Sequence, residues 1–321
     1  MRLVAITRIL NEADLVEAFV RHTAALVDHH IFLDNGSTDG TLEILESLKG
    51  EGVSVEIHHN AEVEFAEVHQ LNLLFRLAAS TRGTGPDQQG ADWVIPLDAD
   101  EFLDVRQIAE GWRVFLANEK AEVLAARVRA YVACRDDPTD ELLVTARITH
   151  AREADDNTKV ILRGALYARG AQLQAGFHCV EINGGKLPPR LEPRLLLAHY
   201  AVRSPWQWIA KCVVGWTRVV AGGSSAIGRG LGGHYRGPFE TLRDNPAWIL
   251  RNPVHMELPR ASELGLTQDQ LPYLGTPLRY TKPVDYHSRA MAAMMRQMEN
   301  LALRVGELNE PRARLRHPFM R

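Results

Sequence analysis

The chain has 321 residues, of which 45% are hydrophobic and 24% are charged, a composition typical of a soluble globular protein with a sizeable core. Its net charge of -3 lacks the basic excess of most nucleic-acid binders, so no nucleic-acid partner is expected. No window approaches the roughly 18 apolar residues that a transmembrane segment needs.

Strand and helix patterns alternate through the first third of the chain. Short apolar segments predict strands, and apolar residues at helical spacing predict helices. The strands are predicted at residues 3–7, 30–33, 53–57 and 93–98, the helices at residues 13–27, 39–49 and 66–79, and a surface loop at residues 80–90. Strands that alternate with helices favour parallel pairing through right-handed crossovers. The sequence therefore predicts an α/β fold with a Rossmann-type, mostly parallel sheet flanked by helices.

The pattern becomes irregular after residue 136. Residues 147–185 predict short strands and loops, and residues 204–220 predict a tryptophan-rich helix. Residues 222–237 are rich in glycine, which predicts a mobile loop that closes as a lid or is merely disordered. Residues 286–305 predict a C-terminal helix with four methionines, which are expected to pack on the core or on a second copy of the chain.

Carboxylates directly follow the apolar segment 93–97. Asp98, Asp100 and Glu101 end a strand that is predicted to be buried, and ligands usually sit at the carboxyl ends of strands in open α/β sheets. Closely spaced carboxylates repel one another unless a cation or a proton lies between them, and a hard divalent ion is the natural occupant. Because such an ion attracts phosphate, these residues predict a nucleotide-diphosphate site.

A second constellation, residues 34–41, lies between the second strand and the second helix. Its Asn-Gly pair and the following Ser and Thr equally fit a plain strand-to-helix turn. The carboxylate of Asp34 is more than such a turn is expected to need, and it is suited to accept hydrogen bonds from a base or a ribose. The GxGxxG fingerprint is absent, which argues against a nicotinamide dinucleotide.

The first predicted turn carries further polar residues at the same edge of the sheet. Thr7 ends the first strand, and Arg8 is placed to balance phosphate charge. Asn11 and Glu12 fit two roles equally well, as ligand contacts or as caps of the first helix.

Three of these elements together resemble a family 2-type glycosyltransferase with a GT-A fold. The resemblance is to the bacterial branch with an Asn-Glu element, an Asp-Asn-Gly-Ser-Thr-Asp-Gly-Thr element and an Asp-x-Asp-Glu-Phe element, found here at residues 11–12, 34–41 and 98–102. The stretch His199-Tyr200, with Ser204 and Lys211, is similar to a fourth element of that branch. The branch usually has Lys before Asn-Glu, where this chain has Leu10, so Arg8 would take over its contact with phosphate.

The resemblance implies roles for individual residues. Asp98 would contact the ribose or the metal, Asp100 would bind the metal, and His199 would be a further ligand of Mn²⁺ or Mg²⁺. The nucleoside would be surrounded by Thr7, Arg8, Asn11, Glu12, Asp34 and Asn35.

The reaction implied is transfer of a sugar from a nucleotide-sugar to a hydroxyl, with inversion, in which a base deprotonates the acceptor. Glu181 and His178 are the favoured candidates for this base. Other acids in the region, which are weaker candidates, are Glu153, Asp155 and Asp156. A solvated structural acid remains the alternative for each carboxylate.

The implied organisation is a GT-A-like catalytic domain over residues 1–220, with a nucleotide-sugar half (1–135) and an acceptor half (136–220). Residues 221–321 would form a glycine-rich loop and a helical C-terminal extension, through which a homo-oligomer would form. The donor is expected to be a UDP-sugar and the acceptor a carbohydrate or a glycolipid.

Two other functions were weighed. A nucleotidyltransferase would need a glycine-rich turn after the first strand, and residues 7–12 contain no glycine. A non-catalytic nucleotide- or sugar-binding relative is disfavoured because both Asp98 and Asp100 are present.

The expected location is cytoplasmic. The three cysteines are far apart, with no CxxC pair and no metal-finger spacing, which favours a reducing compartment. The chain opens on a strand-like segment rather than a signal peptide. Attachment to the inner membrane surface stays open as a variant of this expectation.

Overall fold

A computed structural model describes the whole chain except residues 61, 81–89, 155, 247–257 and 310–321. Its centre is an eight-stranded mixed sheet in the order β3-β2-β1-β4-β8-β6-β12-β5. The strands are β1 (Leu3–Ile9), β2 (His29–Asp34), β3 (Val55–His59), β4 (Trp93–Pro96), β5 (Glu101–Asp104), β6 (Val123–Ala130), β8 (Thr158–Arg163) and β12 (Arg190–His199).

The amino-terminal half of the sheet is parallel, as predicted. β1 pairs in parallel with β2 and β4, and β2 pairs in parallel with β3. β6 and β12 are also parallel, whereas β8 runs antiparallel to both β4 and β6, and β5 runs antiparallel to β12. The carboxyl ends of β1, β2 and β4 therefore meet at one edge.

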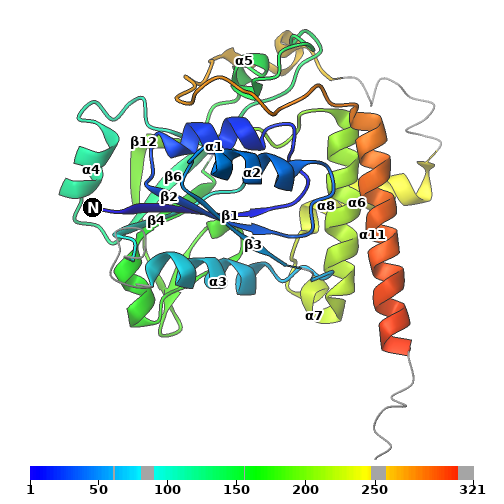
Figure 1. Cartoon of the computed structure of the whole chain (residues 1–321), viewed down its shortest axis with the longest axis horizontal. Coiled ribbons are helices and arrows are strands. Elements are labelled where there is room, and N and C mark those ends of the chain that lie inside the picture. The colour runs from blue at the N-terminus through cyan, green and yellow to red at the C-terminus, as the bar shows by residue number, and fades with distance from the viewer. Residues whose placement is uncertain (61, 81–89, 155, 247–257, 310–321) are drawn as a thin grey trace, which may run out of the picture.

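Helices cover both faces of the sheet. α1 (Val16–Ala24) and α2 (Thr41–Gly50) lie on one face and α3 (Glu67–Ala79) on the other (Figure 1). Because successive side chains of a strand point to opposite faces, Leu3 and Ala5 pack in the core that contains Phe19 of α1. Val4 of the same strand packs in the core that contains Phe75 of α3.

Shorter elements complete the fold. α4 (Trp112–Asn118) borders the sheet, and a small antiparallel sheet joins β9, β10 and β11. These elements are β9 (Gln172–Leu173), β10 (Val180–Ile182), β11 (Gly185–Leu187), η2 (Gly164–Arg169), η3 (Ala175–Phe177), α5 (Val144–Arg147), β7 (His150–Ala151), η4 (Ala261–Leu264) and β13 (Thr267–Gln268).

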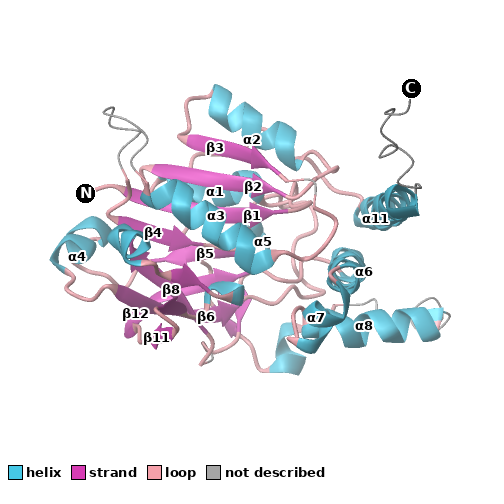
Figure 2. Cartoon of the chain, turned by 90° about the horizontal axis from the view of Figure 1, so that it is seen from below, coloured by secondary structure: helices cyan, strands magenta, loops and turns pink. Residues whose placement is uncertain are grey.

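Further helices stand beyond the carboxyl ends of the parallel strands (Figure 2). α6 (Pro205–Ala221) begins where Ser204 Oγ accepts a hydrogen bond from the Gln207 amide at 3.0 Å, and it packs against both α8 (Gly233–Asp244) and α11 (Tyr286–Asn309). No helix in the described ranges is long and apolar enough to cross a membrane.

The expectation of a glycine-rich loop at residues 222–237 is wrong. The structure has two helices there, α7 (Gly223–Gly228) and the first part of α8. Gly223, Gly230 and Gly232 have positive φ angles of 78°, 71° and 57°, and such glycines end helices without steric cost. The glycines therefore separate short helices. The loop predicted at residues 80–90 falls almost entirely outside the described residues.

The segment that precedes α11 is anchored on α1 by a buried carboxylate. Glu17 is fully buried, and it accepts backbone hydrogen bonds from Arg279, Tyr280 and Thr281 at 2.7 to 2.9 Å. Arg21, one turn further along α1, donates to the same carboxylate at 2.9 Å. These donors outweigh burial and lower the pKa of Glu17.

Replacing this carboxylate should weaken the fold. Glu17→Gln puts an amide N–H₂ among backbone donors, so we expect a loss of about 3 kcal/mol in the free energy of unfolding. Urea denaturation at neutral pH measures it. The exposed Glu46 on α2 provides the control, since Glu46→Gln should change stability by less than about 0.5 kcal/mol.

The difference in stability between wild type and Glu17→Gln should depend on pH, and the direction of that dependence follows from the lowered pKa of Glu17. A carboxyl group whose pKa is lowered by folding stabilises the protein above its ordinary pKa of 4.5 and loses that effect as the pH falls through the folded value. The stability gap between wild type and Glu17→Gln should therefore narrow in acid. A gap that widens below about pH 4 would contradict the assignment.

Candidate functional site

A cavity of about 720 Å³ opens at the carboxyl edge of the sheet. The first turn, the turn after β2, the acids after β4 and the helices α6, α8 and α11 all contribute to its wall. The predicted site residues that line it are Arg8, Asn11, Glu12, Asn35, Asp98, Asp100, His178 and His199. Thr7, Asp34 and Glu181 are not among the lining residues.

Two polar turns lock together beside the cavity. The Asn11 side chain accepts a hydrogen bond from the Thr38 amide at 2.8 Å, and Ser37 Oγ accepts one from the Asn11 amide at 2.9 Å. Thr41 Oγ1 accepts from the Glu12 amide at 2.8 Å. The polar residues of these two turns thus hold the first turn in place.

Asp34 and Thr7 both form hydrogen bonds with other residues of the protein. The Asp34 carboxylate accepts hydrogen bonds from the amides of Gly36 and Ser37 at about 3.1 Å, so the turn does need this acid. Thr7 Oγ1 is fully buried and lies 2.8 Å from His30 Nε2.

Each acid of the Asp98–Asp100 pair has a lysine partner. Lys159 Nζ donates to Asp98 Oδ2 at 2.7 Å and lies 3.0 Å from Glu101 Oε1. Lys211 Nζ donates to Asp100 Oδ2 at 2.6 Å, and His199 Nε2 lies 3.6 Å from Asp100 Oδ1. The repulsion that the sequence predicts between these carboxylates is therefore relieved by two ammonium groups.

Burial and charge act in opposite directions on these groups. Burial alone would raise the pKa of Asp100, but Lys211 and His199 outweigh it and hold that pKa well below the ordinary range. The pKa of Asp98 is also lowered, because Lys159 outweighs burial, whereas burial prevails at Glu101 and raises its pKa. Asp100 in turn overcomes burial and raises the pKa of His199. Asp98 and Asp100 are thus ionised and charge-compensated.

Buried Arg203 joins the acids of the first turn to Asp100. Its guanidinium is hydrogen-bonded to Glu12 and donates to Asp14 Oδ2 at 2.7 Å, and it lies 3.9 Å from Asp100 Oδ2. Burial would raise the pKa of Asp14, but Arg203 and Arg289 lower it strongly, whereas burial raises the pKa of Glu12.

The arginines Arg8 and Arg218 also line the cavity. The Arg8 guanidinium lies 5.4 Å from the Phe65 ring centre, and its Nη1 is buried without a hydrogen-bond partner. Arg218 donates to the Glu62 carbonyl at 3.0 Å, and burial and the charge of Arg8 lower its pKa to about 10. These groups offer hydrogen bonds and positive charge to an anion.

The two candidate bases lie in different surroundings. His178 lines the cavity, and its Nδ1 donates to the Thr158 carbonyl at 2.8 Å, which leaves Nε2 as the free acceptor. Glu181 lies on β10 and accepts a hydrogen bond from Gln174 at 3.2 Å. Asp155, a weaker candidate, lies outside the described residues.

The close approach of α8 to α6 depends on a glycine. A Cβ atom at Gly215 would lie 2.6 Å from the Tyr235 ring, and both residues line the cavity. The C-terminal extension therefore forms part of the cavity wall, to which α11 adds Tyr286 and Arg289.

Sequence reasoning missed Arg203, Asp14 and Lys159. Lys159 had a visible signal, because it directly precedes three apolar residues, Val160 to Leu162, in a short strand segment. Arg203 had none, since its partners lie almost 190 residues away in the chain.

Comparison with known proteins identifies a family. Residues 5–171, about half of the chain, match the family described as Glycosyl transferase family 2. No curated protein matches the sequence.

Solved structures with a related shape are distant. TarS 1-349 from S. aureus, in complex with UDP, is 11% identical with a TM-score of 0.39; the match covers 68% of this chain and 66% of that one, just under two thirds of its length. The mannosyltransferase PcManGT from Pyrobaculum calidifontis, in complex with GDP-Man and Mn2+, is 14% identical with a TM-score of 0.38. That match covers 97% of this chain and 88% of the other.

Replacing Arg203, whose guanidinium pairs with Glu12 and Asp14, should destabilise the protein. Arg203→Leu leaves Glu12 and Asp14 without their buried partner, so we expect a loss of about 3–5 kcal/mol in the free energy of unfolding. Urea denaturation measures it. Arg296→Leu is the matched control, because Arg296 forms an exposed pair with Glu299 on α11, worth at most about 1 kcal/mol. Equal losses in the two variants would refute the central role of Arg203.

Proposed function

Because the chain belongs to glycosyl transferase family 2, we propose that it transfers a sugar from a nucleotide-diphosphate donor to an acceptor hydroxyl, with inversion. The observation that carries the proposal is the presence of Asp98, Asp100 and Arg8 in the lining of one cavity of about 720 Å³. Acids that suit a cation and a guanidinium that suits phosphate are the two parts that a nucleotide-diphosphate needs.

The donor would lie along the interlocked turns. Asn35 lines the cavity there, while Arg8 has a buried nitrogen without a hydrogen-bond partner, which a phosphate oxygen would satisfy. Lys211 also lines the cavity and carries a positive charge. The motif resemblance favours a UDP-sugar as donor and a carbohydrate or glycolipid as acceptor.

A divalent cation fits the chemistry of the donor atoms. Asp98, Asp100 and His199 present the carboxylate oxygens and imidazole nitrogen that suit Mn²⁺, and the carboxylates also suit Mg²⁺. Their ligand atoms do not all lie within 4.8 Å of one another, and each acid is held by a lysine. Asp98, Asp100 and His199 would hold the cation, and Lys159 and Lys211 would then be available to pair with oxygens of the diphosphate. The bound cation would neutralise charge on the leaving group.

We propose His178 as the base that deprotonates the acceptor. Its Nδ1–H donates to a carbonyl oxygen, so the free Nε2 is the lone pair that accepts a proton. Glu181 is the second candidate, although its carboxylate is occupied by Gln174 and it does not line the cavity.

The extension would belong to the catalytic unit. α8 and α11 supply His234, Tyr235 and Arg289 to the cavity wall, so residues 221–321 would shape the acceptor side. α11 also leaves apolar side chains exposed, which would serve a second copy of the chain or a membrane surface. They are Met291, Met295, Met298, Leu303, Val305 and Leu308.

A nucleotide panel tests the donor site and names its class. UDP, GDP, CDP and dTDP, each with and without Mn²⁺, should reveal one nucleotide that raises the unfolding temperature only with the metal, because a ligand that binds the folded state stabilises it. Asp100→Asn should abolish that shift and also donor hydrolysis. Full turnover in Asp100→Asn would disprove the metal site, and no shift with any nucleotide, with or without Mn²⁺, would contradict the donor site.

Measurements of kcat in two variants distinguish the two candidate bases, His178 and Glu181. His178→Ala should lower kcat by about 10²–10⁴-fold while the nucleotide-induced shift in unfolding temperature stays unchanged. Glu181→Gln should keep kcat within a few-fold of wild type. The reverse pattern would assign the base to Glu181.

A further inference from the structure

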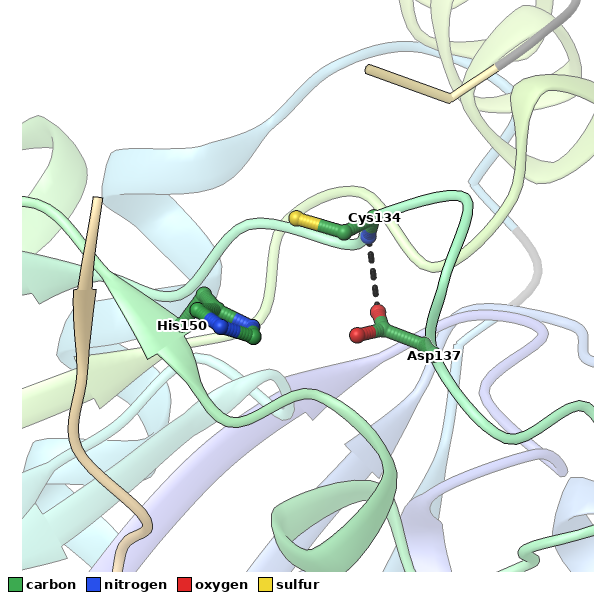
Figure 3. Close-up of side chains that lie close together, drawn as sticks. All are labelled: Cys134, Asp137 and His150. Carbon is green, nitrogen blue, oxygen red and sulfur yellow. Dashed lines mark hydrogen bonds between the residues drawn. The ribbon is translucent and has the colours of Figure 1, made fainter. Parts of the chain in front are cut away.

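A second cluster of metal-binding side chains lies away from the donor cavity. Cys134, Asp137 and His150 each offer one ligand atom, and these atoms all lie within 4.8 Å of one another. Figure 3 shows the three side chains around a common space. None of them lines the donor cavity.

The backbone around the cluster is well fixed. The Cys134 amide donates to Asp137 Oδ2 at 2.7 Å, which holds that carboxylate beside the thiol. His150 lies on β7, and its carbonyl accepts from the Val132 amide at 2.9 Å. The ligands come from both ends of the excursion that contains α5, so the fold brings them together.

Polar atoms of Cys134 and His150 have few or no hydrogen-bond partners. Cys134 is only 2% exposed, and its thiol finds a single carbonyl oxygen, that of Val132, at 3.3 Å. The Nδ1 atom of His150 is buried and has no hydrogen-bond partner. A buried polar atom without a partner costs free energy, and a bound cation would remove that cost.

Charges of both signs lie near the ionisable side chains of the cluster: Asp136 and Asp137 near Cys134, and His150 and Arg147 near Asp137. Burial raises the pKa of the Cys134 thiol to about 11, and the nearby carboxylates of Asp137 and Asp136 add to this effect. Burial raises the pKa of Asp137 as well.

We propose that Cys134, Asp137 and His150 bind a Zn²⁺ ion. A thiolate, an imidazole and a carboxylate are the three ligand types that zinc takes in proteins, whereas Mg²⁺ and Ca²⁺ require oxygen ligands. Binding converts the Cys134 thiol to a thiolate and releases its proton to solvent.

The ion would fasten the return segment of the chain. The Arg135 amide donates to the Pro259 carbonyl at 2.9 Å, and Gln268 of β13 pairs with His150. The segment that leads to α11 therefore crosses directly beside the cluster, and we assign the ion a structural role there.

Metal titration of the full chain tests the site. After chelator treatment, the protein should bind about one Zn²⁺ per chain through these ligands. Its unfolding temperature should rise when the ion binds. The Co²⁺-loaded protein should show a thiolate-to-cobalt charge-transfer band, which a site made of Asp98, Asp100 and His199 does not produce. Absence of Zn²⁺ binding, or of the band, would overturn the proposal.

Variants assign the ligands. Cys134→Ser and His150→Gln should each weaken Zn²⁺ affinity by at least about tenfold, and Cys134→Ser should lose the charge-transfer band. Cys179→Ser is the matched control and should bind as wild type does. Zinc affinity unchanged in Cys134→Ser would refute the site. If Cys134→Ser does not fold, the wild-type cobalt spectrum and His150→Gln still decide the question.

The pH dependence gives an independent readout. Because one thiol proton leaves on binding, wild-type affinity should rise about tenfold per pH unit from about pH 7 to 9. A flat profile would contradict a thiolate ligand.

Discussion

The buried guanidinium of Arg203 is the interaction on which the rest of the site depends. It is hydrogen-bonded to Glu12 and Asp14 and lies near Asp100, so one side chain connects the first turn, the start of α1 and the acids after β4. A buried charge of this kind is tolerated only when its partners are present. The position of each element at this edge is therefore fixed by the others.

The acids that line the cavity are also constrained, because each is paired with a positively charged side chain. Asp98 and Asp100 are held by Lys159 and Lys211, and Glu101 shares the first of these lysines. Asp98 and Asp100 stay ionised because each faces an ammonium group, which holds its pKa below the ordinary range. A ligand that carries both negative phosphates and a divalent cation can exchange partners with these pairs without leaving a charge uncompensated.

Local signals in the sequence predicted much of the fold. Apolar periodicity and the turns between the elements predicted β1, β2, α2 and α3. The acids after β4 indicated the position of the candidate site. The role of Arg203 was beyond such reasoning, because no local pattern relates it to Glu12. The glycines of residues 222–237 misled the interpretation, since glycine marks the end of a helix as readily as a loop. The anchoring of residues 279–281 by Glu17 depends on a contact that spans more than 260 residues.

The contact between Gly215 and Tyr235 has a consequence for sequence divergence. Any side chain at position 215 would enter the space of the Tyr235 ring, so the two positions cannot drift independently. A descendant that acquires alanine at position 215 must first lose the aromatic ring at position 235 or move α8 away from α6. Either route reshapes the cavity wall, so a change of one methyl group on α6 would alter the shape of the cavity in such a lineage.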